Sequence, residues 1–366
     1  MVYLCGCLSA GKGNRAINLQ LILPLHNTVN GKLLKEQIRS TRQDRVTVSF
    51  YRYHHLKDAA GFRDELYAAW EKLGVLGRTY VADEGINAQV SVPRENFNAF
   101  REQLYSIPFL NGIRLNLAIQ DDGRSFFKLK ILLRKKIVAD GIEDPQFDVT
   151  QCGVHVDAEA FNRLASDENT VIVDMRNHYE SEVGHFRNAI CPDADTFREE
   201  LQVVEDLMAG QEGKNLLMYC TGGIRCEKAS AWMKYRGFSN VYQLEGGIIH
   251  YTRQVREKGL DNLFIGKNFV FDERLGERIT PDILSKCHQC GAPCDDHTNC
   301  RNEACHLLFI QCPACRERYE GCCSEPCAET ARLPEEAQRE LRKGKAQQRK
   351  VFRKGRSGHL RPAQDS

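Results

Sequence analysis

The chain has 366 residues, longer than one ordinary domain, and 42% of them are hydrophobic, which is enough for more than one core. The net charge of +2 excludes a general polycation, and no stretch approaches the ~20 apolar residues of a membrane-spanning helix. The opening residues do not form a secretory signal, so we expect a cytoplasmic, non-membrane protein. Because thiols stay reduced in the cytoplasm, the sixteen cysteines indicate metal or redox chemistry.

Residues 1–44 show little periodicity and are predicted to form an N-terminal extension. Residues 45–140 alternate between strand and helix patterns in the order βαββαβ, and the last strand is expected at 113–120. This order is typical of a ferredoxin-like (acylphosphatase-like) α+β sandwich, in which four strands are backed by two helices. Residues 126–138 are a candidate extension of the sheet.

The candidate extension is rich in basic residues, namely Lys128, Lys130, Arg134, Lys135 and Lys136. Such a cluster is either the solvated face of a strand or a surface that faces RNA. The last segment, 331–366, is also basic and is predicted to be a solvated tail.

Residues 141–149 contain Gly, Pro and acids without an apolar period, and we interpret them as a linker. From 150 to 258, short apolar runs that end near residues 176, 220 and 247 alternate with helical patterns. This alternation predicts a parallel sheet flanked by helices, which is an α/β domain.

Cys220 ends one of these apolar runs and opens a short loop. Chemistry in parallel sheets lies at the carboxyl ends of strands, and a glycine turn before a helix lets backbone N–H groups point inward. The loop residues that would form this anion cradle are Thr221, Gly222, Gly223 and Ile224, followed by Arg225. Because N–H dipoles and a guanidinium favour the anion, the pattern predicts a nucleophilic thiolate at Cys220. Cysteine-dependent phosphatases use a longer loop, so a compact group fits better than phosphate.

Residues 259–330 form a cysteine-rich segment with two C-x-x-C motifs, typical of a zinc ribbon. The predicted zinc ligands are Cys287, Cys290, Cys312 and Cys315, with disulfides as the alternative. The six remaining cysteines of the segment, with His297 and His306, suit a second site, but their spacing does not select four ligands. The segment has too few large apolar residues to fold on a core alone.

Three ordered motifs resemble the rhodanese signatures: residues 171–190, 219–230 and 241–248. Asp174 and Arg176 belong to the first, and from their place after a strand we expect them to brace the active loop. Together with residues 82–93 and the cysteine motifs, these signatures resemble the bacterial rhodanese-type tRNA uridine hydroxylases. That family makes 5-hydroxyuridine at the wobble position 34 with molecular oxygen.

The resemblance implies that Cys220 is the nucleophile or persulfide carrier, that residues 221–225 cradle it, and that the partner is the anticodon loop of tRNA. No motif for a catalytic cofactor is evident, so oxygen is expected as co-substrate and zinc as a structural ion. Two routes stay open, attack of Cys220 on the base or a persulfide on Cys220. A sulfurtransferase that carries sulfane sulfur on Cys220 and a non-enzymatic adaptor are the alternative functions.

Overall fold

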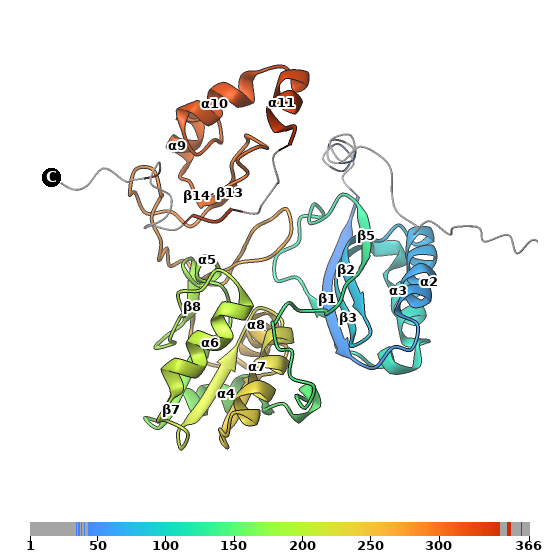
Figure 1. Cartoon of the computed structure of the whole chain (residues 1–366), viewed down its shortest axis with the longest axis vertical. Helices are drawn as coiled ribbons and strands as arrows, with labels where there is room; N and C mark the ends of the chain where they lie inside the picture. Colours follow the sequence, from blue (N-terminus) through green and yellow to red (C-terminus); the bar gives the residue numbers. More distant parts are fainter. Residues whose placement is uncertain are drawn as a thin grey trace, which may run out of the picture.

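The computed structural model describes residues 43–344, 350–352 and 360, together with residues 34, 36, 38 and 40. Most of the predicted N-terminal extension lies outside the described residues. Three regions follow in chain order: an N-terminal mixed sheet, a central α/β domain and a cysteine-rich C-terminal region (Figure 1). The predicted fold class is therefore confirmed. Within the described residues, no helix combines the length and apolarity needed to cross a bilayer.

The N-terminal sheet has the strand order β4-β1-β3-β2-β5. Its elements are β1 (Arg45–Tyr53), α2 (Ala59–Lys72), β2 (Leu76–Ala82), β3 (Gly85–Pro93), α3 (Phe97–Tyr105), β4 (Asn116–Leu117) and β5 (Leu129–Leu133). Pairs β1–β3, β2–β3 and β1–β4 are antiparallel, as in a ferredoxin-like sandwich, and β5 adds to β2 in parallel. Short 3-10 turns at Arg94–Asn96 and Pro108–Leu110 flank α3.

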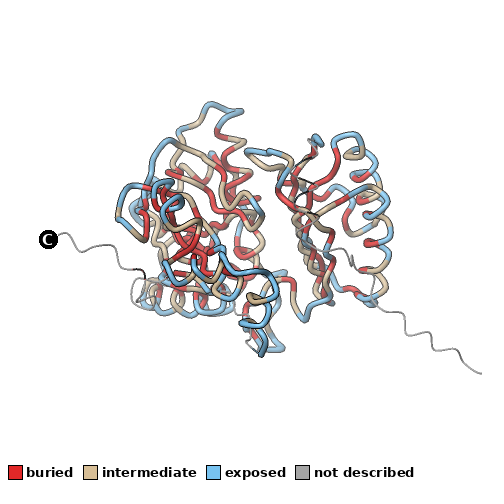
Figure 2. Tube along the Cα trace, turned by 90° about the horizontal axis from the view of Figure 1, so that it is seen from above, coloured by how far each residue is buried: buried red, intermediate tan, exposed pale blue. Residues whose placement is uncertain are grey.

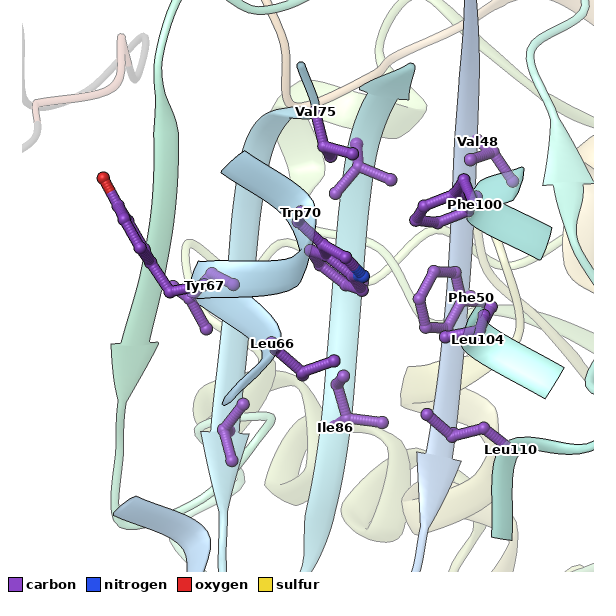
Figure 3. Close-up of a cluster of buried hydrophobic side chains, with 14 of the residues drawn as sticks. Val48, Phe50, Leu66, Tyr67, Trp70, Val75, Ile86, Phe100, Leu104 and Leu110 are labelled. Atoms are coloured by element: carbon purple, nitrogen blue, oxygen red, sulfur yellow. The ribbon is translucent and has the colours of Figure 1, made fainter. Parts of the chain in front are cut away.

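One face of this sheet forms a hydrophobic core with α2 and α3. Phe50 packs edge-on against Trp70 with ring centroids 6.3 Å apart, and Trp70 lies 5.5 Å from Phe100 (Figure 3). Each buried side chain of this size contributes about 1.5–3 kcal/mol by leaving water. Because side chains alternate along a strand, the residues between these core positions, such as Ser49 and Tyr51, lie on the opposite face. Figure 1 shows that this second face is turned toward the central domain.

Strand β4 is much shorter than the predicted 113–120. After Leu117 the backbone groups leave the sheet and bind side chains of the other two regions. Arg253 donates to the carbonyls of Leu117 and Ala118 at 3.0 and 2.9 Å, and the N–H of Ile119 donates to Glu277 at 3.0 Å. Strand β4 therefore ends because of contacts with the other regions, and the local sequence pattern contains no information about such contacts.

The central domain has a parallel sheet, as the sequence predicted, and its strand order is β6-β10-β9-β7. Its elements are β6 (Val154–Val156), α4 (Ala158–Ala165), β7 (Thr170–Asp174), α5 (His178–Ser181), β8 (Gly184–Phe186), α6 (Phe197–Met208), β9 (Asn215–Tyr219), α7 (Ile224–Tyr235), β10 (Val241–Leu244) and α8 (Gly247–Lys258). Strand β6 and helix α4 were not predicted, since β6 has three residues of which two are exposed. Asp157 caps α4 by accepting from the N–H of Ala160 at 2.9 Å.

The C-terminal region begins beside the central domain, because β11 (Phe264–Asn268) pairs with both β8 and β12 (Glu277–Arg278). It continues with β13 (His297–Asn299), β14 (Leu308–Ile310), α9 (Pro313–Arg318), α10 (Glu325–Arg332) and α11 (Glu335–Arg342). The predicted basic tail, 331–366, therefore begins with a helix, α11. Further along this tail, the ring of Phe352 stacks on that of His288, with ring centroids 3.9 Å apart. Seen from above, buried segments run through both halves of the molecule (Figure 2).

Candidate active site

Cys220 lies directly after the central strand β9, at its carboxyl end, and its side chain is buried. The backbone N–H of Gly223 donates to the Cys220 sulfur at 3.2 Å. Gly223 is the N-cap of α7 with φ of 100°, a left-handed conformation that glycine adopts at little cost. The turn therefore presents the positive end of α7 to the sulfur.

The surroundings of Cys220 favour its thiolate. Burial alone would raise its pKa, but the Cys226 thiol, the Arg225 guanidinium and the backbone N–H groups of residues 225 and 226 outweigh burial. The pKa of Cys220 is lowered to about 6. Burial also raises the pKa of Cys226, so Cys226 serves as a neutral donor inside the core. At neutral pH the sulfur of Cys220 is mostly ionised.

Arg225 does not lie free in the loop. Its Nη1 and Nη2 atoms bind the two carboxylate oxygens of Glu180 at 2.7 and 2.9 Å, and both side chains are buried. Glu180 in turn belongs to a capping box with Asn177 at the start of α5. This bidentate pair fixes the guanidinium beside Cys220, so Arg225 acts through its charge. Glu180 lies within the first signature, residues 171–190, but the sequence did not predict this partnership, although the capping-box spacing was a signal for its orientation.

Asp174 and Arg176 form a fully buried ion pair at 2.6 Å at the end of β7. Asp174 also accepts a hydrogen bond at 2.8 Å from the hydroxyl of Tyr219, the residue before Cys220. The N–H of Met175 donates to the Tyr219 carbonyl at 2.8 Å. These contacts hold the end of β9, which is how this pair would brace the active loop.

The glycine pair of the third signature lies against the same loop. Gly247 has φ of 65°, and a Cβ there would lie 2.4 Å from the Cys220 carbonyl oxygen. No side chain fits so close to backbone atoms. The N–H of Ile248 donates to that carbonyl at 3.0 Å, which closes the loop onto α8.

The polar face of the N-terminal sheet docks on the active loop, which the sequence did not predict. Asn116 Nδ2 donates to the Gly222 carbonyl at 3.3 Å, and the hydroxyl of Tyr51 donates to Glu227 at 2.9 Å. Tyr53 reaches the carbonyl of Ile224 at 3.4 Å. The sequence predicted a strand at β1 but not what covers its polar face.

A buried lysine of the central domain forms ion pairs with the N-terminal domain. Lys228 of α7 binds Glu84 at 2.8 Å and also binds Asp140, and the side chain of Asp140 is fully buried. Asp140 additionally pairs with Lys136 at 2.6 Å. The following residues, interpreted as a linker, are packed: Phe147 lies edge-on against Trp232, with centroids 5.8 Å apart.

This docking encloses a cavity of about 340 Å³ beside Cys220, within the size range of small-molecule sites. All three regions contribute to its wall. The N-terminal sheet contributes Ser49, Tyr51, Arg78, Tyr80, Asn87, Gln89 and Asn116, the loop contributes Cys220, Thr221, Gly222, Ile224 and Arg225, and the C-terminal region contributes Phe271, Asp272 and Arg274. The site is therefore larger than the rhodanese-type loop alone.

The five basic residues of the predicted RNA patch have different environments in the structure. Lys136 binds Asp140 and the Ile142 carbonyl, so it serves packing at the domain junction, contrary to an RNA-facing role. Arg134 lies over the ring of Tyr80, 5.5 Å from its centroid. Lys130 and Lys135 are exposed, and Lys128 is half-buried.

The cysteine-rich region contains two groups of four thiols whose sulfur atoms lie within 4.8 Å of one another. The first cysteine cluster is the predicted set Cys287, Cys290, Cys312 and Cys315, and the second cysteine cluster is Cys300, Cys305, Cys323 and Cys327. Every cysteine in the described part of the chain is a free thiol. Contacts such as Cys290–Cys312 at 3.6 Å and Cys323–Cys327 at 3.7 Å are longer than a disulfide bond of about 2.05 Å. Both groups could bind metal.

The cysteine loop lies at the end of a central parallel strand. It is held by the acid–arginine pair of the first signature and by the glycine pair of the third. This arrangement defines a rhodanese-like protein with additional domains at both ends. Family models agree in chain order. The "UPF0176 acylphosphatase like domain" matches residues 45–137, the "Rhodanese-like domain" matches 157–254, and the "Rhodanase C-terminal" model matches 265–328.

Curated relatives match across nearly the whole chain. The tRNA uridine(34) hydroxylases of Sodalis glossinidius and Enterobacter sp. are 56% and 54% identical to it over 333 residues, covering 91% of this chain and 95% of each relative. That of Leptospira interrogans is 53% identical and covers 91% of both chains. The chain belongs to the tRNA uridine(34) hydroxylase family, which confirms the predicted resemblance.

Proposed function

We propose that this enzyme hydroxylates uridine 34 of tRNA in the cavity beside Cys220, with the Cys220 thiolate as nucleophile. Family membership assigns the reaction, since relatives that carry this name match 91% of the chain. One observation supports the place of the reaction: the sulfur with a pKa of about 6 forms part of the wall of a cavity large enough for a nucleoside. A base stacked in an anticodon loop must leave its stack to enter such a cavity.

The chemistry of uracil suggests how a thiolate could promote hydroxylation at C5. Attack of the Cys220 sulfur on C6 forms an S–C6 bond and moves the C5–C6 π pair onto O4 as an enolate. Molecular oxygen, reduced to the peroxide level by an external two-electron donor, then gives one oxygen atom to C5 and the other to water. Loss of the C5 proton and of the thiolate restores the double bond and yields 5-hydroxyuridine. Loop N–H groups and the charge of Arg225 would stabilise the anions on this path.

We further propose a structural zinc ion at each cysteine cluster. Four thiolates around one point are the ligand set of structural zinc. Backbone N–H groups already point at these sulfurs, as in Cys312 N–H to Cys287 at 3.4 Å and Cys323 N–H to Cys300 at 3.5 Å. Such bonds orient metal-bound thiolates. Each cluster connects short strands and helices of the C-terminal region, which have few large apolar residues of their own.

The protein is therefore expected to contain two zinc ions per chain. Cys312→Ser should remove one equivalent and Cys323→Ser the other, while Cys191→Ser, outside both clusters, should retain two. Elemental analysis of protein purified without added metal, combined with thiol counting under denaturing conditions, measures this. Full-length protein with no bound metal and paired cysteines would contradict the proposal.

The function itself is tested by mass analysis of tRNA nucleosides from cells that lack this gene. Loss of 5-hydroxyuridine and its derivatives, with recovery when the wild-type gene is returned, is the expected result. Loss of thiolated nucleosides with normal 5-hydroxyuridine would instead indicate a sulfurtransferase.

A further inference from the structure

A straight row of five polar or charged residues crosses the N-terminal sheet on its cavity-facing side. The register pairs Asn116 with Ser49, Ser49 with Gln89, Gln89 with Arg78, and Arg78 with Lys130. Directly paired residues point to the same face of a sheet. We name this set the cross-strand row.

The row begins at the active loop. Asn116 binds the Gly222 carbonyl, and Ser49 Oγ lies 3.9 Å from the point where a Cβ on Gly222 would stand. Ser49, Gln89 and Arg78 all belong to the cavity wall that includes Cys220. The row ends at Lys130, an exposed cation on the outer strand β5. With strands about 4.8 Å apart, Ser49 and Lys130 are separated by roughly 14 Å.

The middle of the row has unused binding groups. Among the described residues, neither the Gln89 amide nor the Arg78 guanidinium has a side-chain hydrogen bond or ion pair, and Gln89 is half-buried. In the neighbouring row, by contrast, Tyr51 binds Glu227 and Asn87 binds the Ile137 carbonyl at 3.2 Å. Polar groups that line a cavity without a protein partner are open to bind ligand or water.

We propose that the cross-strand row is the binding track for the anticodon loop, with the base at Gln89 on the side of the active loop and phosphates at Arg78 and Lys130; this rests on the proposed function. The Watson–Crick edge of uracil has an N–H between two carbonyl oxygens, and a carboxamide offers a complementary acceptor and donor. Arginine forms bidentate bonds to phosphate. The exposed cations at one end, and the neutral amide of Gln89 in the cavity wall that includes Cys220, match a single strand whose base enters the cavity.

Binding to an anticodon stem-loop RNA tests the phosphate end of the track. Fluorescence anisotropy is measured with Cys220→Ser protein, so that no turnover occurs, over a series of salt concentrations. Arg78→Gln in this background should weaken binding about tenfold, and the slope of log K against log salt should become less negative by about 0.7, the value for one single-strand phosphate. Arg101→Gln, on helix α3 at the other face of the sheet, is the matched control. Equal affinity and slope for both variants would overturn the proposal.

The base end is tested by the preference of the protein for a stem-loop with uridine over cytidine at position 34. Gln89→Leu should reduce that preference about tenfold without changing the salt slope, as expected for the loss of one or two hydrogen bonds. Gln89→Glu keeps the size of the side chain but its carboxylate cannot donate to a uracil carbonyl. It should therefore also reduce the preference for uridine, even if the leucine variant folds poorly. An unchanged preference in the glutamate variant would remove Gln89 from the track. Wild-type protein that binds RNA without hydroxylating it would count against the proposed function alone.

Discussion

Cys220→Ser should lower hydroxylation of uridine 34 on the order of 10³-fold or more, the scale seen when an enzyme loses its nucleophile. A serine hydroxyl fits the same turn but stays protonated at neutral pH, so the anion that the loop stabilises is lost. The measurement is 5-hydroxyuridine per tRNA, by mass analysis, in cells that lack the native gene and express the variant. Cys191→Ser, at a half-buried cysteine of the same domain outside the active loop, should behave as wild type.

If Cys220→Ser retained full hydroxylation, both routes through this sulfur would be excluded. The substitution leaves the cavity wall contributed by the N-terminal sheet unchanged. If the variant kept part of its hydroxylation activity and bound tRNA normally, Cys220 would therefore act in catalysis and not in substrate recognition.

Lys228→Met should lower the free energy of unfolding by about 3–5 kcal/mol, the cost of breaking a buried ion pair by removing one partner. Asp140 is fully buried and would keep Lys136, whose side chain is partly exposed, as its one charged partner among the described residues. Because Glu84 belongs to the N-terminal domain and Lys228 to α7, the variant also weakens the junction that encloses the cavity. Lys234→Met, at an exposed position on the same helix, should stay within about 0.5 kcal/mol of wild type.

The two tryptophans of the chain report on the two domains, since Trp70 lies in the N-terminal core and Trp232 lies on α7. Urea unfolding of Lys228→Met followed in a Trp70→Phe background isolates the signal of the central domain. An unfolding midpoint equal to that of Lys234→Met in the same background would show that the buried cation does not stabilise the junction.

The active loop could be predicted because its chemistry is local in the sequence. A strand, Cys220, two glycines, Arg225 and a helix follow one another without interruption, so the turn and the helix start come from adjacent residues. The first cysteine cluster was predictable for the same reason, since each C-x-x-C motif brings two thiols to one point. The second cysteine cluster has no such spacing, and only the fold brings Cys300 and Cys327 together.

The rest of the site depends on contacts between segments that are far apart in the chain. The partner of Arg225 is Glu180, 45 residues away, and the Asn116 contact to Gly222 spans 106 residues. The strand patterns of β1 and β3 carried no information about the surface that covers their polar face. The early end of β4 and the burial of Asp140 against Lys228, 88 residues away, have the same origin.

The central claim, that the loop holds Cys220 as a thiolate, is tested most directly by its alkylation rate as a function of pH. Iodoacetamide reacts with the thiolate, and mass analysis of the peptide that contains Cys220 assigns the rate to this residue. Because ionisation creates the reactive form, the rate should rise with pH, pass its midpoint at about 6 and level off near neutrality. A midpoint at or above about 8.5, the value of an ordinary cysteine, would contradict the account.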